Sequence, residues 1–337
     1  MSQMVGLSVT RPRLALSMGD PSGIGPELAV KLLADAANLA RADVYVLASE
    51  AEIKAAADEA GVSVPIAAVP SAEAVTAVGS RFADVDFVRG QVSREAGARV
   101  MADLLDALAM FDRGDVDGIM FTPLNKSALH LAGMHEEDEL RWFAKELGFE
   151  GTTSELNFVP GLTTSRVTSH VSVKDVAGLI NARAVAESIR LLNRVVQGAG
   201  VPNPRLAVCA LNPHAGENGQ FGREEIDHIL PGIALTRSEG IDATGPYPCD
   251  TVFIRARDGE FDGVVTMYHD QGQIAMKLMG FDQGVTVQGG LPVPIATPAH
   301  GTAYEIVGRG IAKTGPSQRA FEIAVDLAVQ NMQSGTH

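Results

Sequence analysis

Three of the eight histidines stand directly after strand-like apolar runs, where side chains from different strands can meet. His170 follows SRVTS, His214 follows AVCALNP, and His269 follows VVTMY. Neutral imidazoles are the commonest ligands of zinc-like metals. Three strand-end histidines of one sheet could therefore converge on a metal ion. The alternative is that each has a separate structural role, and sequence order alone leaves both interpretations open.

Charged side chains near these histidines could assist the same chemistry. Asp250 lies in CDTVF, and Asp270 and Lys277 lie in HDQGQIAMK. They could orient a histidine ring, bind a carboxylate or transfer protons. The alternative role is surface salt bridging, which fits Asp250 less well because we expect it to precede an apolar strand directly.

Two glycine-containing segments could hold backbone close to a ligand. In GDPSGIGPE, the glycines Gly19, Gly23 and Gly25 precede a helix that Pro26 starts, and helix N-terminal amides attract anions. PHAGENGQFG has a similar glycine content. The first pattern by itself favours a plain strand-to-helix turn, and the second is also compatible with a solvated loop.

The elements that must position these residues alternate along the chain. Apolar runs that read as strands are RLALSM, DVYVLAS, DGIMFTP, RLAVCAL and DGVVTMYH. Runs with the 3.6-residue period of amphipathic helices are PELAVKLLADAANLA, SREAGARVMADLLDALAMFDRG and DVAGLINARAVAESIRLLNRVVQ. This alternation predicts an α/β fold with a largely parallel sheet. Ligands of such sheets bind beyond the carboxyl ends of the strands.

The length and composition narrow the class of protein. A chain of 337 residues exceeds the usual size of one core, so we expect two domains. The net charge of −14 disfavours nucleic acid and anionic membranes and favours a small-molecule substrate. Cys209 and Cys249 have no metal-type spacing, and we expect buried, reduced thiols. No segment resembles a signal peptide or a membrane span, so we expect a cytoplasmic protein.

Seven segments, in this order, carry a resemblance to a known family. They are GDPSGIGPE, TPLNK, TSHVSVKD, LNPHAGENGQFG, GPYPCDTVF, YHDQGQIAMKLMGF and HGTAYEIVGRG. Together they resemble the 4-hydroxythreonine-4-phosphate dehydrogenase family of pyridoxal phosphate biosynthesis and its catabolic relatives. The first and last segments are also similar to motifs of the isocitrate and isopropylmalate dehydrogenases.

The resemblance implies a two-domain α/β dehydrogenase with its active site in the interdomain cleft. We expect the first domain, with the cofactor loops, at residues 1–135 with 286–337. The second, with the metal ligands and the interface of a homodimer, is expected at residues 136–285. The resemblance implies NAD or NADP, and one divalent metal, with zinc expected and magnesium, manganese or cobalt as alternatives. The implied metal ligands are His170, His214 and His269; Lys277 contacts substrate; and the cofactor adenine contacts His300, Gly301, Thr302 and Ala303.

These parts imply a reaction. A metal that chelates the substrate hydroxyl and carboxylate lowers the pKa of the hydroxyl and favours hydride transfer to the nicotinamide. The resulting 3-keto acid can then lose carbon dioxide. Lys277 or an aspartate, with Asp250 and Asp270 as candidates, would deliver the final proton.

The chain departs from the family where substrate binds. The family has a GHTE segment after NKxAL, but here the stretch reads LAGMHEEDELRWF, whose acidic run would repel a phosphate. Counting from YHDQG, Thr286 and Ile295 occupy the positions of a substrate-binding Asn and Arg. Because Arg suits bidentate phosphate recognition, its replacement removes an anchor. We therefore expect an altered phosphate pocket, with Thr286 still contacting the substrate, and a related hydroxy acid or diol as substrate.

Three other functions compete with this one. The first is the authentic oxidation of 4-phosphohydroxy-L-threonine in pyridoxal phosphate biosynthesis. The second is a non-catalytic binding protein that retains the fold; the presence of all three histidines and Lys277 argues against it. The third is a phosphate acyltransferase on a related fold, which would not need strand-end histidines.

Overall fold

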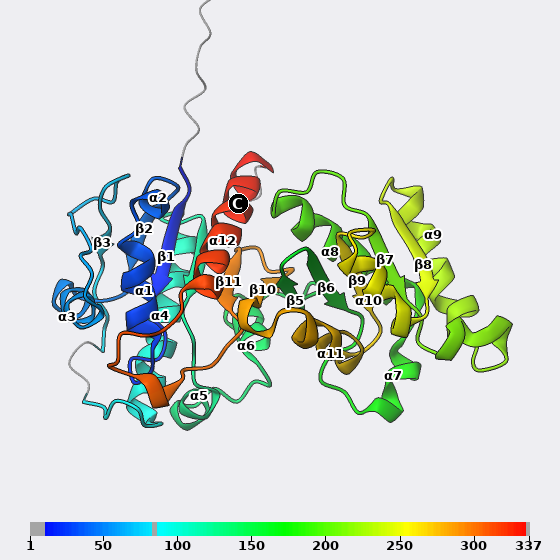
Figure 1. Cartoon of the computed structure of the whole chain (residues 1–337), viewed down its shortest axis with the longest axis horizontal. Helices are drawn as coiled ribbons and strands as arrows, with labels where there is room; N and C mark the ends of the chain where they lie inside the picture. Colours follow the sequence, from blue (N-terminus) through cyan, green and yellow to red (C-terminus); the bar gives the residue numbers. More distant parts are fainter. Residues whose placement is uncertain (1–10, 83–85, 335–337) are drawn as a thin grey trace, which may run out of the picture.

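The computed structural model describes residues 11–82 and 86–334, which form one mixed sheet with helices packed on both faces (Figure 1). Within these residues the sheet has eleven strands in the order β3-β2-β1-β4-β11-β10-β5-β6-β9-β7-β8. In chain order the strands are β1 (Arg13–Ser17), β2 (Asp43–Val46), β3 (Thr76–Ala77), β4 (Gly118–Phe121), β5 (Ser154–Val159), β6 (Leu162–Arg166), β7 (Leu206–Cys209), β8 (Ala243–Tyr247), β9 (Gly263–Thr266), β10 (Val285–Gly289) and β11 (Ile295–Pro298). The predicted α/β fold class and its five strand-like runs are confirmed.

Helices connect most of these strands. They are α1 (Gly25–Leu33), α2 (Ala36–Leu39), α3 (Glu50–Ala60), α4 (Arg94–Asp112), α5 (Lys126–Ala132), α6 (Glu139–Glu146), α7 (Val173–Leu179), α8 (Ala182–Gly198), α9 (Leu230–Ser238), α10 (Cys249–Arg257), α11 (His269–Gly280) and α12 (Gly315–Ser334). Shorter helical turns are η1 (Pro213–Gly219), η2 (Glu225–Ile229), η3 (Phe281–Gln283) and η4 (Tyr304–Ile306).

Two segments that were predicted as single helices are each divided. Residues 26–40 form α1 and α2, and residues 175–197 lie in α7 and α8. At each break a new helix begins, because the side chain of Asp35 or Asn181 accepts a backbone N–H of the following turn. Asp and Asn favour this capping position over a helix interior. The third predicted helix is confirmed as α4.

The prediction that Asp250 precedes an apolar strand is wrong. Asp250 lies in the first turn of helix α10, where its side chain is exposed. Val252, Phe253 and Ala256 are the buried residues of this helix. Their spacing places them on one helical face, and five residues of sequence are too few to distinguish that pattern from a short strand.

The sheet continues without a break through the middle of the molecule (Figure 1). Strand β11 runs parallel to β4, whereas β10 is antiparallel to both β11 and β5. Strand β10 therefore joins the strands of the N-terminal half to those of the central part of the chain. The division into domains at residues 1–135 with 286–337 and 136–285 stays a prediction.

Apolar packing differs between the two faces of the sheet. On one face a single apolar cluster extends from α1 across α12 to α8, and it includes Leu14, Phe321 and Leu192. The other face carries two separate clusters, one beneath α4 and α6 and one beneath α10 and α11. Between these two clusters lie β10 and β5, of which only Val159 at the end of β5 packs against either cluster, and this leaves room for a site.

Along the central strands β5 and β10, apolar side chains on one face of the sheet alternate with polar side chains on the other. On β5 and β10, residues Leu156 and Val287 belong to the continuous apolar cluster. Their neighbours Glu155 and Gln288 point to the opposite face, because successive side chains of a strand alternate. The sheet thus presents a polar floor between the two separate clusters.

The structure also bears on the predictions of reduced cysteines and of no membrane-spanning segment. Both cysteines are free, and Cys209 is buried, as predicted, whereas Cys249 is only half-buried. Burial raises the pKa of the Cys209 thiol well above its usual value, which makes it a poor nucleophile. Within the described ranges, no helix combines the length and apolarity that crossing a membrane requires.

The crossing of α4 and α5 gives a test of the packing. A Cβ added at Gly97 would lie 2.0 Å from the carbonyl oxygen of Ala128. Gly97→Ala should therefore lower the free energy of unfolding by about 1–3 kcal/mol in urea titrations. Gly178 of α7 has no atom within 4 Å of such a Cβ, so Gly178→Ala should be neutral or slightly stabilising. Equal stability of the two variants would contradict the described crossing.

Candidate active site

A cavity of about 410 Å³ lies over the polar floor. The residues of the floor, from β5, β10 and β11, are Glu155, Asn157, Thr286, Gln288 and Thr297. The polar or charged residues of the walls are Lys126, Glu139, His170, His269, Gln273 and His300. The cavity therefore contains two of the three predicted histidines together with acidic and amide side chains.

His170 and His269 meet because their strands are neighbours. Strands β6 and β9 are parallel, with Arg166 opposite Thr266 at their carboxyl ends. The chain leaves both strands in the same direction, and the ring centroids of the two histidines lie 5.5 Å apart. This part of the predicted convergence is seen in the structure.

A carboxylate engages the Nδ1 atom of each of these rings. Nδ1 of His170 lies 2.8 Å from Oε1 of Glu137 and 3.3 Å from Oδ2 of Asp138. Nδ1 of His269 lies 2.7 Å from Oδ1 of Asp270. Metal-binding histidines commonly donate one ring N–H to a carboxylate, which orients the ring and leaves the other nitrogen for the ion. The donor set of this cavity therefore fits a divalent metal.

The electrostatic surroundings of His170 also favour metal binding. Burial, then the charge of His269 and that of Lys126, lower the pKa of His170 below its ordinary value. The ring is thus mostly neutral at pH 7, and neutral imidazole is the form that binds metals. Protons compete with a metal for this nitrogen only at lower pH.

The acidic segment after α5 lies inside the site and not on a distant surface. Asp138 is buried and its Oδ1 accepts the Arg141 N–H at 2.8 Å, which starts helix α6. Glu139 lines the cavity with Oε2 3.8 Å from Nζ of Lys126, and its burial raises its pKa. The sequence showed the acidic run, but only the fold shows that it faces His170.

The carboxylates at His170 give a prediction for metal affinity. Replacing Glu137 with Gln and Asp138 with Asn together should weaken binding of a divalent ion roughly 10–100-fold, because His170 loses its orienting partners. Asn still caps a helix, so α6 should persist. Isothermal titration with Zn²⁺ or Mn²⁺ measures the effect. Glu136→Gln is the matched control, because Glu136 pairs with Lys145 instead; an equal loss in that variant would contradict the assignment.

His214 does not line the cavity that contains the other two histidines. It is exposed in turn η1, and its ring centroid lies 6.4 Å from that of Phe221. Among the described residues, the His, Cys, Asp and Glu ligand atoms that all lie within 4.8 Å of one another belong to Glu137, Asp138 and His170. Neither His214 nor His269 is in this group, although His269 lies beside His170. Within the described residues, the three predicted ligands therefore do not form one cluster of ligand atoms.

The backbone at His214 is unusual. Six successive residues of η1, from His214 to Gly219, have positive φ, including His214 at 53° and Glu217 at 43°. Non-glycine residues adopt this conformation at an energetic cost and are frequent at functional sites. The buried carboxylate of Glu225 fixes the preceding chain by accepting the N–H groups of Leu211 and Asn212 at 2.9 and 2.7 Å.

Lys277 borders the site without lining its main cavity. It is exposed on α11, two turns beyond His269, and lines a small pocket of about 50 Å³. That pocket shares Asn157 and Gln273 with the main cavity. Asp270 is exposed and contacts His269, as described above.

The glycine loop after β1 packs against the HGTA turn. The N–H of Ile24 donates to the carbonyl of Thr302 at 3.0 Å, and a Cβ at Gly23 would lie 2.8 Å from Cβ of Thr302. The Tyr304 hydroxyl donates to the buried Asp20 at 2.5 Å. Of the HGTA residues, His300 and Gly301 line the cavity. The glycine loop is thus more than a turn, because it positions the segment at the cavity edge.

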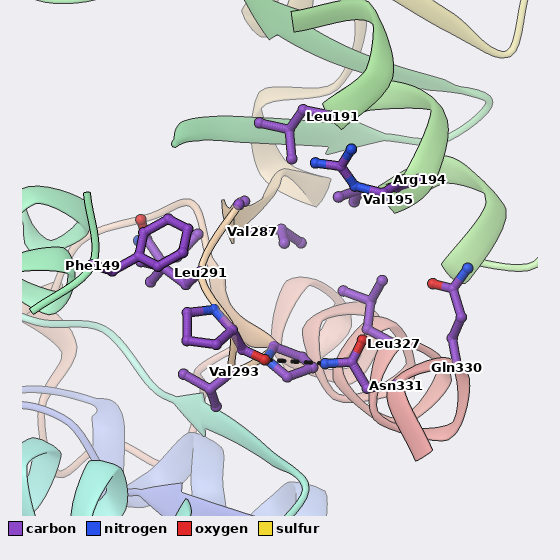
Figure 2. Close-up of a pocket in the computed structure, with 15 residues that line it drawn as sticks. Phe149, Leu191, Arg194, Val195, Val287, Leu291, Val293, Leu327, Gln330 and Asn331 are labelled. Atoms are coloured by element: carbon purple, nitrogen blue, oxygen red, sulfur yellow. Dashed lines mark hydrogen bonds between the residues drawn. The ribbon is translucent and has the colours of Figure 1, made fainter. Parts of the chain in front are cut away.

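A second cavity lies on the opposite face of the sheet (Figure 2). It has a volume of about 510 Å³ and lies between α8, α12 and the segment after β10. Its walls are largely apolar, with Leu191, Val195 and Leu327 facing it and Arg194 at α8 (Figure 2). None of the predicted site residues lines it, so the smaller cavity carries the candidate chemistry.

The fold places the chain in a broad class of α/β enzymes. The structure is similar to a β-decarboxylating dehydrogenase of Thermococcus kodakarensis, at 14% identity and TM-score 0.50. It is also similar to the phosphotransacetylase EutD of Staphylococcus aureus, at 12% identity and TM-score 0.56. At these identities the likeness concerns the fold alone, and it confirms the predicted dehydrogenase-like architecture.

Comparison with sequence families gives a narrower assignment than the fold does. The chain belongs to the family described as the pyridoxal phosphate biosynthetic protein PdxA, whose profile matches residues 30–324. A Pseudomonas aeruginosa protein provisionally named 4-hydroxythreonine-4-phosphate dehydrogenase 2 is 48% identical, over 93% of this chain and 96% of that protein. An Oceanobacillus iheyensis protein provisionally named D-threonate 4-phosphate dehydrogenase is 33% identical, over 94% of this chain and 98% of that protein.

Two solved structures extend this comparison. The 4-hydroxythreonine-4-phosphate dehydrogenase of Klebsiella pneumoniae is 34% identical with TM-score 0.79, covering 95% of this chain and 98% of its own. A terephthalate 1,2-cis-dihydrodiol dehydrogenase of Burkholderia xenovorans is 29% identical with TM-score 0.71, covering 94% and 98%. The chain is thus a dehydrogenase acting on a CH–OH group, in a family that is NAD-dependent and uses a divalent metal.

Proposed function

We propose that this protein oxidises a hydroxy acid or diol with NAD or NADP and a divalent metal, decarboxylates the resulting 3-keto acid, and takes substrates without a terminal phosphate. The observation that carries the proposal is the cavity itself. It joins two carboxylate-oriented histidines to a polar floor whose lining residues carry no positive charge, with Lys126 in the wall beside Glu139. Authentic oxidation of 4-phosphohydroxy-L-threonine is the alternative, which the names of the relatives favour.

His170 and His269 would hold the metal through their Nε2 atoms. The exposed His214 would join them in the homodimer that the family resemblance implies. The metal, when bound, polarises the substrate hydroxyl and lowers its pKa. Zinc suits imidazole ligands, and manganese, magnesium or cobalt would suit a site with added carboxylate and hydroxyl oxygens.

The chain's own residues would handle two proton transfers. The substrate would pass its hydroxyl proton to a basic group of the site and a hydride from the carbon that bears the hydroxyl to the nicotinamide, and the protonated group could return the proton after decarboxylation. Loss of carbon dioxide then leaves a carbanion equivalent that needs one proton. Lys277 is our candidate donor, with Asp250 and Asp270 as alternatives, and Glu139 is added because it lines the cavity and its burial raises its pKa.

The charges of the cavity argue against a phosphate dianion. Ile295 is fully buried in the apolar cluster beneath α4, so the arginine position offers no positive charge. Lys126 lies near Glu139, and Arg166 pairs with Glu155. Thr286 lines the floor and would contact substrate through its hydroxyl.

The cofactor would bind at the edge formed by the HGTA turn. His300, Gly301, Thr302 and Ala303 are proposed to contact the adenine, and the glycine loop holds this turn in place. His300 and Gly301 line the cavity, so a cofactor there would reach the floor from the side of β11. Cytoplasmic location stays a prediction.

Exposed apolar side chains support the proposed homodimer. Val173 on α7 is 75% exposed and Leu278 on α11 is 84% exposed; α7 begins shortly after His170, and α11 begins at His269. Exposed apolar groups of this kind commonly mark a contact between proteins. Leu278→Glu should produce a monomer in sedimentation experiments, and an unchanged mass would contradict a contact through α11.

Oxidation of a panel of hydroxy acids and diols tests the proposed function. Absorbance of NAD(P)H should rise only with added Mn²⁺ or Zn²⁺, and carbon dioxide should form in equal amount when a hydroxy acid is oxidised. A chelator should abolish both signals, and metal should restore them. Full turnover in the metal-stripped protein would contradict the mechanism.

A further inference from the structure

Gln288 is a buried polar residue at the floor of the site that the mechanism does not use. Only 3% of its surface is exposed, and its Oε1 atom has no hydrogen-bond partner among the described residues. Buried polar atoms are almost always hydrogen-bonded, and an unpaired one costs about 1–3 kcal/mol. An unpaired buried oxygen beside an active-site cavity is therefore a group that awaits a donor from a ligand.

The strand register establishes that this side chain faces the active site. Thr286 lies opposite Thr297 on β11 and Asn157 on β5, and Gln288 lies opposite Glu155. All five residues line the same cavity. Val287, between them, belongs to the apolar cluster of the other face. The second cavity, on that other face, is lined by Val287, Gln288 and Gly289 of this strand. Because successive side chains of a strand alternate, the side chain of Gln288 points to the opposite face from Val287, toward the active-site cavity.

The same register explains what replaced the family's arginine. Continuing the β10–β11 pairing by one residue brings Gln288 opposite Ile295, the position of that arginine by resemblance. Across the sheet this row consists of Ile295, Gln288 and Glu155. Ile295 is fully buried and does not line the cavity, so the row presents to a ligand the amide of Gln288 and the carboxylate of Glu155, which is already paired with Arg166. A phosphate there would lack the arginine and would lie beside the Glu155 carboxylate and the Oε1 acceptor, whereas a hydroxyl can donate the hydrogen bond that Oε1 lacks.

We propose that Gln288 determines substrate specificity by accepting a hydrogen bond from a neutral hydroxyl of the substrate, at the place where the family's arginine would take a phosphate. This inference rests on the proposed function, and it specifies the substrate group that the protein recognises, a neutral hydroxyl. The ligand class is a polyhydroxy acid with a free hydroxyl, discriminated both from its deoxy analogue and from its phosphate ester.

The test compares substrates that differ only at this group. Wild-type protein with metal and NAD should show a kcat/KM about 10- to 100-fold higher for 2,3,4-trihydroxybutanoate than for 2,3-dihydroxybutanoate. In Gln288→Met this ratio should fall to about threefold or less. Gln288→Glu keeps an acceptor oxygen and should retain the preference. Metal affinity, measured by titration, should be unchanged in both variants and reports that the site is intact.

The outcomes separate the two proposals. If wild type turns over neither substrate, the proposed function and this inference both fail. If it turns over both and the ratio is near one, or if Gln288→Met leaves a large ratio unchanged, the function stands and the role of Gln288 is wrong. A wild-type ratio near one overturns the role of Gln288 even where Gln288→Met does not fold, and loss of the preference in Gln288→Glu would overturn it as well.

Discussion

Replacing His269 with alanine should abolish metal binding and lower kcat/KM for the hydroxy acid by at least ~10³-fold. The bound ion contributes several kcal/mol of charge stabilisation at the reacting hydroxyl, and about 4 kcal/mol corresponds to that factor. Because His269 and His170 face each other across 5.5 Å, loss of either ring removes the pair that would hold the ion. Metal titration and NAD(P)H absorbance measure the two effects separately.

His228→Ala is the matched control for the loss of a histidine. His228 lies in η2 and lines none of the walls described for the active-site cavity. It should retain metal affinity and turnover. His214→Ala adds a further test. We expect this variant to lose metal affinity and turnover if His214 joins the metal site when the homodimer forms. Retained activity in His269→Ala would contradict the metal site, whereas retained activity in His214→Ala alone would remove His214 from it.

Replacing Lys277 with methionine should lower kcat by about 10²–10⁴-fold while metal affinity stays unchanged. Positioned proton donors contribute factors of this size, and Lys277 is the candidate beside the cavity. Methionine keeps the unbranched stem of the side chain up to Cε and favours helices, so helix α11 should persist. Steady-state kinetics and metal titration on the same preparation separate the catalytic effect from the binding effect.

The control for the lysine substitution is Lys54→Met. Lys54 is exposed on α3 and pairs with Glu50, far along the sequence from the site elements. Its loss should change neither kcat nor metal affinity. If Lys277→Met behaves like Lys54→Met, the final proton comes from another group, and Glu139 would then be the next residue to replace.

Much of the fold was predictable because its signals are local. The apolar runs that form the parallel strands are short and bounded by polar residues, and the strand-end positions of His170 and His269 follow from them. The helix breaks at Asp35 and Asn181 could also have been predicted, because both are helix-capping residue types within segments of helical periodicity. The error at Asp250 came from a pattern too short to distinguish strand from helix.

The rest of the site could not be predicted, because it depends on pairings between distant segments. Glu155 and Gln288 share a floor only through the pairing of β5 with β10, which joins segments more than a hundred residues apart. Glu137 reaches His170 through a loop whose course carries no periodic signal. Sequence comparison identified Ile295 as a changed position, but the register was needed to show that Gln288 lies opposite it.

The central claim is that the substrate pocket of this family member binds a neutral hydroxyl at the place where the family binds a phosphate. The most direct measurement is the ratio of kcat/KM for 2,3,4-trihydroxybutanoate to kcat/KM for its 4-phosphate, with 4-phosphohydroxy-L-threonine measured beside them under the same metal and NAD conditions. We predict a higher kcat/KM for the unphosphorylated acid than for either phosphate. Rapid turnover of 4-phosphohydroxy-L-threonine alone would contradict the account.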